Sequence, residues 1–106
     1  MINNIKNGIT CNLVVDSLNT SNNIDFTKYD FVYYEYVRDT GLVLVSNYIP
    51  VKVLTPDVKE FNHAQYVNGN YNLEVTTQVS NKGIKGYVKT QTGWVISKFK
   101  VYGIKL

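Results

Sequence analysis

The sequence predicts an all-β fold, namely a single antiparallel β-sandwich or small barrel in which residues 1–106 form one domain. Its length of 106 residues suits one compact domain with one core. Val, Ile, Thr and Tyr are abundant, whereas alanine occurs once and glutamate three times, which favours strands over helices. Short alternating runs separated by turn signals indicate about seven or eight short strands.

The first strand pattern covers residues 9–16, where apolar and polar residues alternate. Its apolar phase contains Cys11 together with Ile9, Leu13 and Val15, so we expect the Cys11 thiol to point into the core as an inert group. Residues 17–30 are polar and aperiodic, which is typical of a loop.

A hairpin is predicted next, between strands at 31–38 and 42–54. The connection, Asp39-Thr40-Gly41, ends in a glycine that supplies the positive φ such loops need. Pro50 cannot donate a hydrogen bond to a neighbouring strand, so it marks an edge or a bend.

The second half of the chain begins with a helix-start signal, Thr55-Pro56, which predicts at most one helical turn near residues 56–61. The Asn68-Gly69 pair then predicts a hairpin turn. Two further glycine-containing turns, at 81–83 and 91–93, separate the closing strands. Tyr71 shares the apolar phase of its strand, and Trp94, just after the 91–93 turn, is in phase with Ile96, so we expect both side chains in the core.

Catalytic chemistry finds little support in the sequence, and we predict no enzyme, no catalytic residue, no cofactor and no metal. His63 is the single histidine and Cys11 the single cysteine, so neither a multi-histidine zinc site nor an intramolecular disulfide can form. A Cys11–His63 nucleophile pair is conceivable, but it needs Cys11 to leave the core. The candidates for an acid pair are Asp16, Asp25, Asp30, Glu35 and Glu74. The first three could also supply oxygen ligands to calcium, although their spacing matches no calcium-binding loop.

Charge is distributed unevenly along the chain. Residues 81–106 carry six lysines and no acid, whereas residues 1–80 carry five cationic and eight acidic side chains, so a net of +6 and a net of −3 make up the total of +3. If the two closing strands are neighbours, alternation places lysines and tyrosines on a common basic face. Its members are Lys85, Tyr87, Lys89, Lys98, Lys100 and Tyr102. Such a face suits an acidic protein surface or single-stranded nucleic acid.

The aromatic stretch at 31–38 carries large side chains in both strand phases. One phase holds Tyr33 with Glu35, and the other holds Tyr34, Tyr36 and Arg38. Since one small core need not bury them all, we predict that Tyr34, Tyr36 and Arg38 form a contact surface, which Tyr48 and Tyr66 extend. Tyr33 is assigned to the core.

In pattern, the hairpin YYEYVRDTGLVLVSNYIPVKV and the closing meander NYNLEVTTQVSNKGIKGYVKTQTGWVISKFKVYGIKL resemble the small β-sandwich structural proteins of tailed-bacteriophage virions. These proteins decorate heads, join neck and tail, or form baseplate and fibre parts. The resemblance covers about two thirds of the chain and rests on no shared motif. It implies a role in structure and assembly.

The sequence therefore predicts a non-enzymatic structural or interaction protein that acts by surface complementarity with other protein subunits, as a homo-oligomer or within a larger assembly. The alternatives are a small binding module for glycan or single-stranded nucleic acid, and a small protein inhibitor of a host enzyme. No run approaches the ~18 apolar residues of a membrane helix, and the N-terminus lacks the apolar segment of a secretory signal. We therefore expect no membrane partner, and a place in a virion or in the host cytoplasm.

Overall fold

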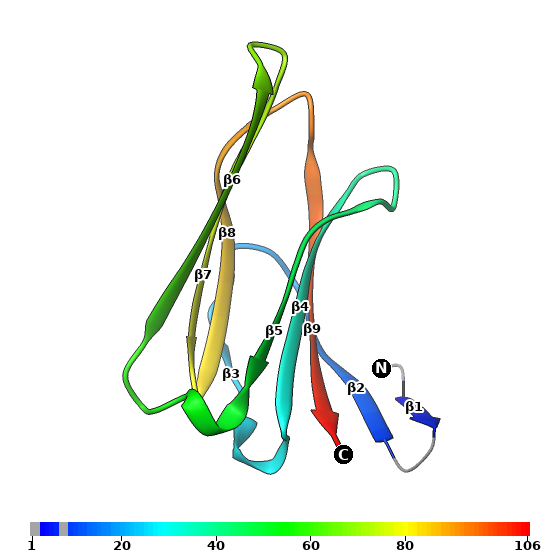
Figure 1. Cartoon of the computed structure of the whole chain (residues 1–106), viewed down its shortest axis with the longest axis vertical. Coiled ribbons are helices and arrows are strands. Elements are labelled where there is room, and N and C mark those ends of the chain that lie inside the picture. Colours follow the sequence, from blue (N-terminus) through cyan, green and yellow to red (C-terminus); the bar gives the residue numbers. More distant parts are fainter. Residues whose placement is uncertain (1–2, 7–8) are drawn as a thin grey trace.

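The computed structural model describes residues 3–6 and 9–106, with side chains from residue 9 onward. It is a β-sandwich of two antiparallel sheets, which Figure 1 shows facing each other along the length of the molecule. One sheet, sheet A, contains β1 (Asn3–Lys6), β2 (Ile9–Asp16), β4 (Phe31–Arg38), β5 (Val43–Pro50) and β9 (Ile96–Lys105). The other, sheet B, contains β3 (Asn22–Asn23), β6 (Lys59–Asn68), β7 (Tyr71–Ser80) and β8 (Gly83–Thr92).

The strand order in sheet A is β1-β2-β9-β4-β5, and in sheet B it is β3-β8-β7-β6. Consecutive strands pair as hairpins in β4–β5 and as a meander in β6–β7–β8. In contrast, β9 crosses to the opposite sheet from β8 and inserts between β2 and β4. As a result, the middle of sheet A is made by a strand distant in sequence from both of its neighbours.

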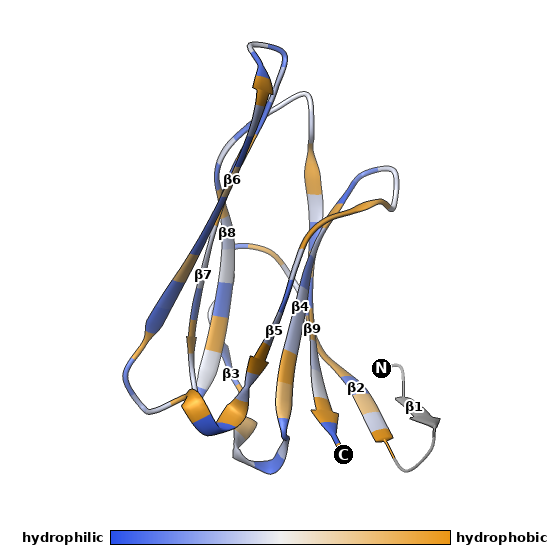
Figure 2. Cartoon of the chain, in the orientation of Figure 1, coloured by the Kyte–Doolittle hydropathy of each residue, from blue (hydrophilic) through white to orange (hydrophobic). Residues whose placement is uncertain are grey.

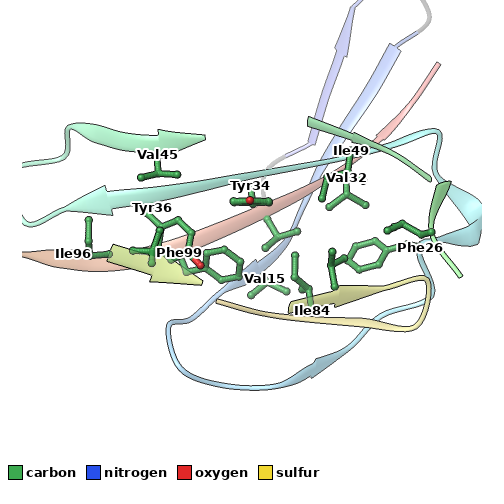
Figure 3. Close-up of a cluster of buried hydrophobic side chains, with 14 of the residues drawn as sticks. Val15, Phe26, Val32, Tyr34, Tyr36, Val45, Ile49, Ile84, Ile96 and Phe99 are labelled. Atoms are coloured by element: carbon green, nitrogen blue, oxygen red, sulfur yellow. The ribbon is translucent and has the colours of Figure 1, made fainter. Parts of the chain in front are cut away.

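The core lies between the two sheets, where apolar side chains from both inner faces interlock (Figure 3). The alternation of orange and blue along several strands in Figure 2 follows this arrangement. Phe99 of β9 is fully buried and packs over Gly86 of β8, where an added Cβ would come within 2.6 Å of the ring. This missing side chain lets the two sheets approach each other closely.

The predicted all-β, antiparallel fold is confirmed, and it is a sandwich. The hairpin turn at Gly41 forms as predicted, with φ +91° and a 2.8 Å hydrogen bond from the Gly41 N–H to the Arg38 carbonyl. Pro50 ends β5, which lies at the edge of sheet A. The short strands β1 and β3 are additions to the predicted set.

No helical turn forms near residues 56–61, where the sequence predicted at most one. The Thr55 hydroxyl does accept a 3.2 Å hydrogen bond from the Asp57 N–H, but the chain then extends directly into β6. The two short helical segments are 3₁₀ turns elsewhere, η1 (Phe26–Lys28) and η2 (Val51–Val53). The capping geometry is local, whereas pairing with β7 decides the conformation of the residues that follow.

The predicted inward direction of Cys11 is also wrong. A bulge between Leu13 and Val15 shifts the register of β2 against β9, so that of the predicted apolar phase only Val15 is buried in the core. Cys11 lies opposite Ile104 on the outer face of sheet A and is half-buried. One inserted residue reverses the face of everything before it, because side chains alternate with a period of two.

Candidate contact face of sheet A

Strand β4 supplies side chains both to the core and to the outer surface of sheet A. Its tyrosines expected on the surface lie in the core, and the one expected in the core lies on the surface. Tyr34 and Tyr36 are 3% and 0% exposed, so the prediction that they form a contact surface is wrong. Their rings meet edge-on at 5.9 Å, and both lie against Phe99 (Figure 3). Tyr33, assigned to the core from the sequence, lies on the outer face.

Tyr36 is bound into the core by its hydroxyl as well as its ring. The hydroxyl donates a 3.0 Å hydrogen bond to the Thr76 carbonyl and lies 2.8 Å from the Thr77 hydroxyl, across the sandwich. Burial raises the pKa of Tyr36 well above its usual value, because the phenolate would lose its water. Tyr36 thus holds the two sheets together as a neutral donor.

Arg38 does not join an aromatic surface. It stands at the end of β4 opposite the buried Ile96, past a register shift that skips Ser97 of β9. Its Nε lies 3.5 Å from the Asp39 carboxylate, and its side chain is 26% exposed. Because Tyr34 and Tyr36 are buried, this strand phase offers no exposed aromatic surface for Arg38 to join.

The outer face of sheet A is organised in three rows that run across the strands. The registers of β5, β4, β9 and β2 define them. The first row is Pro50, Phe31, Ile104 and Cys11; the second is Tyr48, Tyr33, Tyr102 and Leu13; the third is Ser46, Glu35, Lys100 and Asp16. Two adjacent rows are therefore apolar or aromatic on the side of the sheet that faces away from the core. We call these two rows the tyrosine face.

Three tyrosine rings form the centre of the tyrosine face. The Tyr33 ring centroid lies 4.4 Å from that of Tyr48 and 5.9 Å from that of Tyr102, with interplanar angles of 31° and 33°. Tyr48, on the edge strand, is 63% exposed, whereas Tyr33 and Tyr102 are half-buried by their neighbours. Packing against one another orders these rings before any partner binds.

Glu35 borders the tyrosine face and raises the pKa values of groups on it. The Tyr33 hydroxyl donates a 2.7 Å hydrogen bond to the Glu35 carboxylate. Burial, aided by this carboxylate, raises the pKa of Tyr33 to about 12. Burial and then the charge of Glu35 likewise raise the pKa of Tyr102 and of the Cys11 thiol. The face therefore presents neutral hydroxyls and a thiol of low nucleophilicity at neutral pH.

Glu35 is also the signal in the sequence that could have located this face. A carboxylate is rarely buried without a partner, and Tyr33 shares its strand phase. The phase that contains Glu35 should therefore have been assigned to the outside. The large rings of Tyr34 and Tyr36, which flank Glu35 in the sequence, made the opposite assignment look equally reasonable.

The predicted basic face does not exist as one surface. It assumed that the two closing strands are neighbours, but β8 lies in sheet B and β9 in sheet A. One half of the set, Lys85, Tyr87 and Lys89, is therefore carried by sheet B, and the other half, Lys98, Lys100 and Tyr102, lies on the outer face of sheet A. Lys85 stacks over the Tyr87 ring at 5.5 Å, and Lys89 pairs with Glu74 at 3.7 Å.

The outer face of sheet B is polar, and its side chains satisfy one another. The Gln78 amide donates to Glu60 at 2.9 Å, and the Thr76 hydroxyl donates to Asn62 at 2.7 Å. Both pairs connect β6 with β7. This face has the appearance of an ordinary solvated surface.

The remaining predicted residues are spread over the molecule. Tyr71, expected in the core, is 44% exposed, and its ring packs 5.6 Å from that of Trp94, which is partly buried against the core. Cys11 and His63 lie in different sheets, so the arrangement does not bring together a nucleophile pair. Within residues 3–6 and 9–106, no group of three or more His, Cys, Asp or Glu side chains gathers into a metal site.

Comparison of the chain with protein-family models, curated proteins and solved structures finds no match. The part of the chain that the structure describes also contains no helix of the length and apolarity needed to cross a bilayer. The physical properties of the surfaces therefore carry the functional interpretation.

Proposed function

We propose that this chain is a non-enzymatic interaction protein and that its tyrosine face binds another protein subunit. A single observation carries the proposal: two adjacent cross-strand rows on the outside of sheet A are apolar or aromatic, and no described element covers them. Contiguous apolar surface of this kind is uncommon on a monomer and is typical of contact sites. Tyrosine is enriched in such sites, because its rigid ring loses little entropy on binding.

The charges near the tyrosine face favour a protein over a nucleic acid. Asp16 and Glu35 stand in the third row beside Lys100, and Lys98 lies opposite Val37 on the next cross-strand pair. Two acids and two lysines give no net attraction for a phosphate backbone. Mixed charges around an apolar centre instead match the rim of a protein interface.

The ring geometry argues against a glycan. A sugar stacks on an aromatic ring that offers its face to solvent, but the three tyrosine rings here tilt against one another at short distances. Only Tyr48 is mostly exposed. The surface is thus better suited to burial under a packed side-chain layer than to stacking of single sugar rings.

The setting that we propose is the virion of a tailed bacteriophage, where such a domain would join neighbouring subunits. This part of the proposal is supported by the pattern-level resemblance of residues 33–53 and 70–106, and by the tyrosine face, which suits a contact between subunits.

Site-specific photo-crosslinking in the producing cell tests the proposal. A photoreactive phenylalanine replaces Tyr48 on the tyrosine face or, as the matched control, Tyr87 on sheet B, and adducts are identified by mass spectrometry. We expect one discrete protein adduct from position 48 and none from position 87. Equal adducts from both positions, or a chain that binds a glycan array or an oligonucleotide through Tyr48 without any protein adduct, would contradict the proposal.

A further inference from the structure

A second surface, unrelated to the tyrosine face, is the outer edge of β6 (Lys59–Asn68). This strand pairs with β7 on one side, and no described strand pairs with its other side. It runs along the outside of the sandwich for most of its length (Figure 1), and eight of its ten residues are exposed. Its outward backbone N–H and C=O groups are therefore available for pairing with another strand.

The β6 edge has few of the features by which proteins block edge pairing. Of the other long edges, β5 ends in Pro50, and the part of β8 beyond its short pairing with β3 carries Lys85 and Lys89. In β6 both charges, Lys59 and Glu60, stand at the beginning, and residues 61–68 contain neither charge nor proline. Long, uncharged edges are the ones that accept a further strand.

We infer that β6 pairs with β6 of a second copy of this chain, antiparallel and around a two-fold axis, which joins the two B sheets into one continuous sheet. Identical antiparallel strands can pair about a dyad because residue i of one copy faces residue j of the other, and j faces i. This inference does not depend on the proposed function.

A register centred on Ala64 makes the strand self-complementary. The smallest side chain of β6 then lies at the axis, where residue 64 of one copy faces residue 64 of the other. His63 faces Gln65 of the second copy, and Asn62 faces Tyr66 of the second copy, so polar groups meet polar groups. The charged residues at the start of β6 face the uncharged hairpin end near residues 68–69 of the second copy, so no like charges are opposed.

The side of β6 that faces sheet A adds a reason for this contact. Between the edges of β5 and β6 lies an open groove of about 360 Å³, whose lining includes Tyr34, Asn47 and His63. Asn47 donates a 3.4 Å hydrogen bond to the Tyr34 hydroxyl there. A β6 strand added to the edge would place its inward side chains over the mouth of this groove. The open side of each sandwich would thereby close.

Sedimentation velocity across a concentration series, with matched charge variants, tests the inference. Ala64→Lys sets two lysines against each other at the axis. Thr90→Lys adds the same charge to the same sheet, on β8, which β7 separates from the β6 edge. We expect a dimer for the unmodified chain and for Thr90→Lys, and a dissociation constant raised tenfold or more for Ala64→Lys, since opposed like charges cost about 1.4 kcal/mol or more.

Hydrogen exchange tests the same inference on the unmodified chain, so its result does not depend on whether a variant folds. If β6 pairs with β6, its amides become slower to exchange as the protein concentration rises, while those of β5 do not change. The inference would be overturned by a chain that stays monomeric, or by exchange rates of the β6 amides that do not change with concentration. The β6 edge would then face either solvent or a strand of a different protein. A dimer lost in Tyr33→Ser/Tyr48→Ser but kept in Ala64→Lys would also overturn the inference, because it would place the self-contact on the tyrosine face.

Discussion

The two outer faces of the sandwich differ although the same alternation builds both. On sheet B, Glu60, Asn62 and Glu74 each bind a polar side chain on a neighbouring strand, so that face needs no partner. On the tyrosine face, the rings of Tyr33, Tyr48 and Tyr102 order one another yet leave apolar surface open. Order without full burial distinguishes a prepared contact surface from an ordinary solvated one.

The largest effect should come from the inner side of the strand that carries the tyrosine face. We expect Tyr34→Ala/Tyr36→Ala to unfold the domain, because each truncation of a buried ring costs roughly 3–5 kcal/mol, against a typical total stability of about 5–15 kcal/mol. Circular dichroism and urea titration measure this. A double variant that folds but no longer binds a partner would show that Tyr34 and Tyr36 belong to the contact surface. The contrast between the inner and outer sides of β4 would then be wrong.

A smaller effect is expected when only the hydroxyl of Tyr36 is removed. Tyr36→Phe keeps the ring but leaves Thr77 and the Thr76 carbonyl without their partner across the core. We expect a loss of about 1–3 kcal/mol in the free energy of unfolding by urea titration. Tyr87→Phe on sheet B is the control, and an equal loss in both would show that the cross-sheet bond is not what matters.

Removal of two rings of the tyrosine face should change binding far more than stability. For Tyr33→Ser/Tyr48→Ser we expect loss of the protein contact, with unfolding free energy lowered by about 1 kcal/mol or less per ring. Maleimide labelling of Cys11, which lies on the same face, reports the contact in the unmodified chain: a bound partner should slow it. Labelling that is unaffected while a partner is bound would move the contact elsewhere.

The smallest effect concerns pH. The pKa of Tyr33 is raised to about 12 from an ordinary 10.0, so the folded state favours the neutral hydroxyl. Its contribution to stability is therefore fully present below pH 10 and is lost as the pH rises through about 12. Melting temperatures between those values should fall less steeply in Tyr33→Phe than in the unmodified chain. Parallel slopes would show that this hydroxyl carries no such linkage.

The fold could be predicted from the sequence because its signals are local. Glycine at a turn, as in the Gly41 hairpin, and alternation along a strand act over a few residues. The candidate site depends on what is not local. The bulge in β2 turned Cys11 outward, and the crossing of β9 into sheet A divided the predicted basic face between two sheets. Neither the bulge nor the crossing can be recognised from the residues whose position it changes.

The position of β9 also bears on how the protein is made. Because β9 lies between β2 and β4, these two strands have no neighbour in common until residues 96–105 have been synthesised. The β6–β8 meander, in contrast, can pair while it emerges from the ribosome. The apolar inner side of sheet A therefore stays uncovered until β9 has been made. This order favours slow folding, and it exposes the chain to premature association during translation.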